Sequence, residues 1–109
     1  MRNKRVEINE LEKAAATLQS LVGKLEKCAP KLKAGSAQVS LVNNRLAALN
    51  VALGLMQCYA DLLLEQETAL ATLEKLKTEG KEKTVTYREL FGKKLLNKTM
   101  LERLARYTP

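Results

Sequence analysis

Hydrophobic residues dominate the stretch 39–64, VSLVNNRLAALNVALGLMQCYADLLL, and they recur at helical spacing. Apolar positions three or four residues apart share one face of an α-helix. Here they form two neighbouring stripes, one through Val42 and one through Leu41 that is interrupted by Arg45. A surface helix needs only one stripe, so we expect other helices or another copy of the chain to cover this one from both sides. The residues that we expect at an interface between copies are Leu46, Leu49, Leu53, Leu55, Met56, Tyr59, Leu62 and Leu63.

The same stretch also carries a line of small and polar residues. Asn43, Asn50 and Gln57 belong to it, with Ala47 and Gly54 between them. In one interpretation this line is the solvated face of a mostly buried helix. In the other, the small residues let a second backbone approach, while the amides fix the register of the packed helices, as a core asparagine does in coiled coils. The second interpretation requires hydrogen-bond partners for the buried amides.

Residues 6–29 repeat apolar positions in steps of three and four from Leu11 to Ala29. This spacing predicts an amphipathic helix of about three heptads. Pro30 ends the helix, because proline has no amide donor and disfavours helical geometry in the residue before it. Gly35 marks a short turn, and a short connection makes the helices on either side antiparallel neighbours.

The central helix is predicted over residues 37–78, with Ser36 or Ser40 as its N-cap. Past Leu64 the pattern continues with a single apolar stripe and acidic residues on the other faces. A break near Gly54 or Asp61 is the alternative to one continuous helix.

Residues 86–107 form a third predicted helical segment. Thr86 and Thr99 are each followed by glutamate three residues later, which has the form of a capping box. The segment is therefore two short helices or one helix, and Gly92 favours a break. The predicted fold is all-α: a long helical hairpin with a C-terminal helical segment that packs back on the central helix, bundle-like with three helices, in a single domain spanning 1–109.

Composition supports helix and argues against a membrane protein. The chain has 109 residues, of which 46% are hydrophobic and 4% aromatic. Leucine and alanine outnumber β-branched residues, which favours helix over sheet. Asn50, Gln57 and Asp61 interrupt the longest apolar run, so we expect no membrane span and no membrane partner. No apolar segment follows the basic MRNKR sequence, so we expect no secretory signal and a cytoplasmic location.

The residue types needed for most catalysis are missing from the sequence. It has no histidine, which removes the usual general base and the Cys–His and Ser–His pairs. The phosphate-binding patterns GxxxxGK[ST] and GxGxxG are absent, as is CxxC or HxxxH spacing for zinc. We therefore expect no catalytic residues, no metal and no cofactor. Cys28 and Cys58 fall at apolar helical positions, where free buried thiols are expected, with a disulfide between them as the alternative.

The formal net charge of +7 is concentrated at the two ends of the chain. Such asymmetry indicates a polyanionic partner or simply a soluble surface. Residues 86–107 loosely follow a helix-turn-helix layout, with a first helix over 86–91, a turn over 93–97 and a groove-binding helix over 98–107. Leu95 occupies the position where glycine is usual. The candidate phosphate contacts are Lys93, Lys94, Lys98, Arg103 and Arg106.

These patterns favour a small non-catalytic interaction or scaffold protein that forms a homodimer or another homo-oligomer. The two other helical segments can cover only part of the central helix, and uncovered apolar flanks mark interfaces. A complex with an unidentified protein would cover the same flanks. The alternative function is a DNA-binding regulator that uses residues 86–107, which salt-dependent DNA binding would reveal.

Overall fold

The computed structural model of the chain describes residues 7–108. Over this range the chain folds into three α-helices, α1 (Ile8–Cys28), α2 (Ala37–Thr78) and α3 (Val85–Ala105), with no β-strand. A short 3₁₀ helix, η1 (Ala29–Lys31), follows α1. The all-α prediction is confirmed. The chain divides into two compact units that share α2, and we describe each as a helical hairpin.

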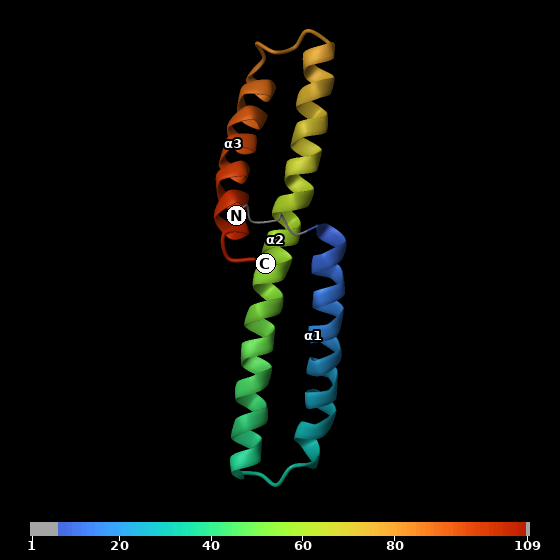
Figure 1. Cartoon of the computed structure of the whole chain (residues 1–109), viewed down its shortest axis with the longest axis vertical. Helices are drawn as coiled ribbons and strands as arrows, with labels where there is room; N and C mark the ends of the chain where they lie inside the picture. Colours follow the sequence, from blue (N-terminus) through green and yellow to red (C-terminus); the bar gives the residue numbers. More distant parts are fainter. Residues whose placement is uncertain (1–6, 109) are drawn as a thin grey trace. The chain divides into compact units, whose positions relative to one another are not determined.

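The first hairpin comprises α1 and the first half of α2, residues 9–58. The two helices run side by side in opposite directions (Figure 1). Leu11 and Val22 of α1 are buried, as is Val42 of α2. Helix α1 ends at Cys28, two residues before Pro30, which lies in η1 instead. This end agrees with the prediction, because a 3₁₀ turn accepts a residue that has no amide hydrogen at its start.

The connection to α2 reverses the chain through Gly35, whose φ of 79° is a left-handed conformation that favours glycine. Of the two predicted caps, Ser36 is the one used. Its Oγ accepts a hydrogen bond from the backbone N–H of Val39 at 3.3 Å. Ser40 lies within the first turns of α2. Helix α2 then runs from Ala37 to Thr78 as one helix, so the alternative of a break near its middle is wrong.

Helix α2 ends in a Schellman motif. The N–H of Lys81 donates to the carbonyl of Leu76 at 2.8 Å, and the N–H of Gly80 donates to that of Lys77 at 3.1 Å. Gly80 has a φ of 73°, as the motif requires. In the same turn the ammonium of Lys81 lies 3.0 Å from the carboxylate of Glu79. This hydrogen bond and the charge of Lys81 lower the pKa of Glu79.

The second hairpin comprises the second half of α2 and α3, which lie side by side in Figure 1. Its core is formed by both helices, and Leu101 of α3 is only 1% exposed. The α2 residues of this core are Tyr59, Leu63, Ala69 and Leu73.

Helix α3 differs from its prediction at three points. Its N-cap is Thr84, whose hydroxyl accepts from the N–H of Tyr87 at 3.3 Å, and not Thr86. Thr99 is no cap either, because its hydroxyl donates to the carbonyl of Leu95 at 3.1 Å inside the helix. The predicted break at Gly92 is also wrong, since α3 passes through it. Glycine lowers helix stability by only about 1 kcal/mol, which the packing of the neighbouring turns can offset.

Candidate interaction interface

One line of positions on the first half of α2 is exposed along its whole length. The positions alternate in steps of three and four, the spacing of a coiled-coil seam. Leu55 is 68% exposed, Val51 65% and Leu41 47%, which are high values for large apolar side chains. We name this line the α2 seam; it consists of Leu41, Asn44, Ala48, Val51, Leu55 and Cys58, all of them exposed.

The predicted interface residues fall into three groups. Leu46, Leu49, Leu53 and Met56 are half-buried and continue the stripe of buried Val42, which is the side of α2 that packs in the first hairpin. Tyr59 and Leu63 are buried and Leu62 is half-buried in the second hairpin. Of the eight, Leu55 alone is exposed and belongs to the α2 seam. The exposed apolar surface of the first hairpin therefore centres on the stripe through Leu41.

The three candidate register residues, Asn43, Asn50 and Gln57, are all exposed. In one copy of the chain they therefore lie on an exposed face of α2. A buried hydrogen-bonding role for these amides would require a partner molecule over that face.

An apolar groove of about 410 Å³ lies beside the α2 seam in the first hairpin. Leu21, Lys24 and Leu25 of α1 form one wall, and Arg45, Ala48 and Leu49 of α2 form the other. Leu21 is 43% exposed, so the apolar surface extends from the seam across to α1. A single antiparallel helix leaves this surface open because it contacts only one side of α2.

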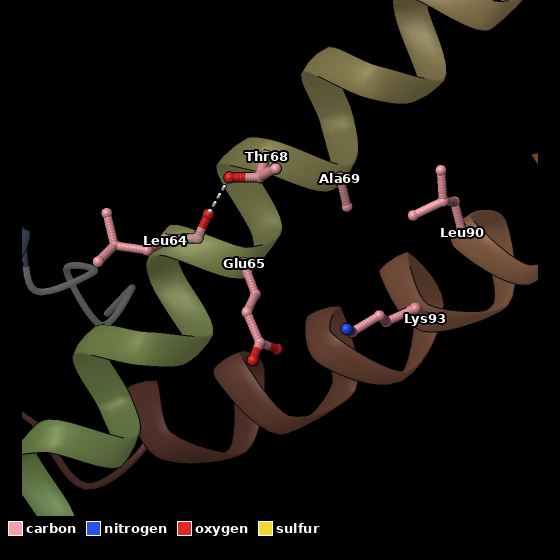
Figure 2. A pocket seen from close by; sticks show the side chains of 6 residues that line it. All are labelled: Leu64, Glu65, Thr68, Ala69, Leu90 and Lys93. Carbon is pink, nitrogen blue, oxygen red and sulfur yellow. Dashed lines mark hydrogen bonds between the residues drawn. The ribbon is translucent and has the colours of Figure 1, made fainter.

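A smaller groove of about 270 Å³ lies between α2 and α3 in the second hairpin. Its apolar lining comes from Leu64, Ala69 and Leu90. Figure 2 shows the side chains of Glu65 and Lys93 extending from the two helices beside it. Thr68 also lines the groove, and its hydroxyl donates to the carbonyl of Leu64 at 3.0 Å. That bond occupies the hydroxyl hydrogen, and we find no nucleophile–base pair in this groove.

Two amide side chains are buried between α2 and α3, and the sequence pattern predicted neither of them. Gln66 is 8% exposed and Asn97 is 2% exposed. The Nε2 of Gln66 donates to the carbonyl of Lys94 at 3.0 Å and so ties the helices together. Within the described residues, Oε1 of Gln66 and Nδ2 of Asn97 have no hydrogen-bond partner. The available signal was position: Gln66 lies three residues after Leu63 and seven before Leu73, on an otherwise apolar stripe.

Helix α3 does not have the predicted helix-turn-helix layout. The turn expected over 93–97 is helical, and α3 is one helix from Val85 to Ala105. Its apolar stripe packs in the second hairpin through Leu101, and packing of this kind favours a continuous helix over two short ones. Nucleic-acid binding by this segment stays a prediction.

The candidate phosphate contacts are not gathered on one side of α3. At about 100° per residue, their positions leave no free arc wider than about 100° of the helix circumference. Lys94 is half-buried, with its Nζ 5.2 Å from the centre of the Phe91 ring, whereas the other four are exposed. The four exposed ones are Lys93, Lys98, Arg103 and Arg106. A groove-reading helix presents its cations toward one groove, so this distribution does not favour that role.

Both cysteines carry free, exposed thiols. The expectation of buried thiols is therefore wrong. Cys58 lies on the α2 seam, and Cys28 is the last residue of α1. In the described part of the chain, no three residues among cysteine, aspartate and glutamate gather as a metal site would require.

Helix α2 is long and apolar enough to cross a membrane, although the interrupted apolar run predicted no membrane span. It contains an 18-residue window of mean hydropathy 1.5, of which 11% is buried. The leucines of this window outweigh Asn50, Gln57 and Asp61 in the average. Core helices of soluble proteins meet the same criteria, so the window identifies apolar surface without assigning lipid to it.

No family model, curated protein or solved structure matches this chain.

Proposed function

We propose that the protein is a small, non-catalytic helical interaction module that self-associates through the first hairpin. The observation that supports this proposal is the exposure of Leu41, Val51 and Leu55 on the α2 seam in a single copy. A row of exposed apolar side chains of this kind, which Asn44 alone interrupts, marks a binding interface. A homo-oligomer supplies the same surface twice, so one patch can cover another around a two-fold axis.

The absence of catalysis in this proposal rests on the sequence. The sequence has no histidine, so other side chains would have to act as general base or metal ligand. These side chains do not occur in any recognisable catalytic or metal-binding motif of the sequence. A cytoplasmic location is also part of the proposal. It rests on the amides and the carboxylate that interrupt the apolar window of α2.

Sedimentation velocity over a range of protein concentrations tests the proposal. The wild-type chain is expected to shift from monomer to dimer as its concentration rises. Leu55→Glu should raise the dissociation constant of the dimer at least tenfold, because a carboxylate at the seam would lose its hydration on association. Asn50→Glu is the matched control, since Asn50 is exposed on the same helix but off the seam.

Circular dichroism must show the same helix content for both variants. A wild-type chain that stays monomeric at hundreds of micromolar would refute self-association. If Asn50→Glu weakened the dimer as much as Leu55→Glu does, the interface would lie on the polar line of α2 and not on the seam.

A further inference from the structure

We infer that two copies associate through antiparallel contact of their α2 seams, with Leu41 of one copy against Cys58 of the other. This inference rests on the proposed self-association and adds the occupant of the seam, its direction and its register. The seam lies entirely within the first hairpin, where all six of its positions are exposed.

The register follows from pairing the seam of one copy with the seam of a second copy that runs in the opposite direction. In one antiparallel register every seam residue has a partner: Leu41 meets Cys58, Asn44 meets Leu55, and Ala48 meets Val51. Each of these layers combines a larger side chain with a smaller one. Alternation of large and small residues lets facing side chains interdigitate at the density of a protein interior. The seam is therefore complementary in size to a reversed copy of itself.

The direction follows from what covers α2 beyond the seam. The seven-residue spacing of Leu41, Ala48 and Leu55 continues at Leu62 and Ala69. In the second hairpin Leu62 is half-buried and Ala69 is only 3% exposed. A parallel partner would run along α2 past Cys58 and would have to displace α3 from them. The α2 helix of an antiparallel partner does not reach Ala69, because it begins at Ala37, which in this register lies opposite Leu62.

The residues beside the seam are compatible with close contact. Ser40, Ala47 and Gly54 precede seam positions at intervals of seven and are all exposed, so one flank consists of small residues. Small residues let two helix backbones approach each other. The charged residue of the other flank is Arg45. In the antiparallel register the two Arg45 residues lie nine positions apart, roughly 13 Å along the helix axis, which keeps their repulsion small.

The size of the seam sets the expected affinity. From Leu41 to Cys58 it extends about 26 Å at 1.5 Å per residue. This places it at the small end of specific interfaces. We therefore expect a dissociation constant in the micromolar range, and we expect Asn44→Leu to lower it by replacing the one amide of the seam.

Disulfide trapping tests the register. In a Cys28→Ser background, Leu41→Cys is combined with native Cys58 and oxidised with glutathione disulfide. Antiparallel seams should give a covalent dimer on a non-reducing gel, in which the introduced thiol of each copy is bonded to Cys58 of the other. Asn43→Cys in the same background is the control, because Asn43 is exposed but lies off the seam, and this variant should stay uncrosslinked.

The outcomes separate this inference from the proposed function. Rapid crosslinking of native Cys58 alone would indicate parallel seams and overturn the inference. A dimer in sedimentation that forms no bond between the introduced thiol and Cys58 would overturn the register while self-association stands. Reduced variants that remain monomeric would overturn both. A monomeric chain that floats with phosphatidylcholine vesicles would overturn both as well, and would assign the seam to lipid instead of a second copy.

Discussion

Replacing Asn97 by leucine should stabilise the second hairpin. Asn97 is 2% exposed in α3, four residues before Leu101, on the side of the helix that packs against α2. Its Nδ2 has no hydrogen-bond partner within the described residues. Leucine has the branched shape of asparagine, is somewhat larger and has high helix propensity, so the substitution removes the unpaired donor without opening a cavity.

The expected gain follows from the cost of the unpaired group. A buried donor without a partner costs about 1–3 kcal/mol. We therefore expect Asn97→Leu to raise the free energy of unfolding by about 1–3 kcal/mol. In a domain of this size each kcal/mol corresponds to about 4–8 °C in Tm. Gln66→Leu is the informative comparison, because it removes an unpaired Oε1 but also the 3.0 Å bond to the carbonyl of Lys94. The net effect of Gln66→Leu on the free energy of unfolding should therefore be smaller than that of Asn97→Leu.

Urea denaturation followed by circular dichroism measures both free energies, at one fixed protein concentration because association adds to apparent stability. A loss of more than about 1 kcal/mol in Asn97→Leu would refute the reasoning, since it lies outside the range expected for relieving an unpaired donor. It would show that the amide of Asn97 is hydrogen-bonded in solution, for which Oε1 of Gln66 is the complementary acceptor.

Three further predictions concern the ends and packing of the helices. Leu101→Ala should lower the free energy of unfolding, measured by urea denaturation, by about 2–5 kcal/mol. Leu96→Ala, at a position that is 60% exposed in the same helix, should change it by less than about 0.5 kcal/mol. Equal effects of the two substitutions would contradict the packing of α3. Gly80→Ala should destabilise the protein by about 1–2 kcal/mol, because Gly80 has a positive φ. Gly92→Ala should stabilise it by up to about 1 kcal/mol, because an added Cβ would meet open space. Urea denaturation of the two variants should therefore show shifts in opposite directions. Lys81→Ala should raise the pKa of Glu79 toward its ordinary value in a carboxyl NMR titration, because Lys81 lowers it. The stabilisation from that pair is present at neutral pH and is lost as the pH falls through the folded-state pKa of Glu79, so an unchanged titration would show that the contact does not form in solution.

The positions of the helices were largely determined by local sequence. Periodic leucines and alanines define α2 from 37 to 78. Pro30 and Gly80 each lie two residues after the end of a helix, because both residues act on the backbone of their own turn. Ser36 caps α2 for the same local reason. The local pattern was wrong where it placed a cap at Thr86 and where it favoured a break at Gly92.

Tertiary structure decided which face of each helix is buried. Two apolar stripes run along α2, and periodicity ranks them about equally, yet α1 covers the stripe of Val42 and leaves Leu55 exposed. Cys58 also stays exposed, whereas the packing of α3 against α2 buries Gln66 and Asn97. The physical reason is that hydrophobic burial is not directional and depends on the neighbouring surface. A sequence specifies which sides of a helix are apolar, but the packing of a second helix determines which of them meets water and is free to bind.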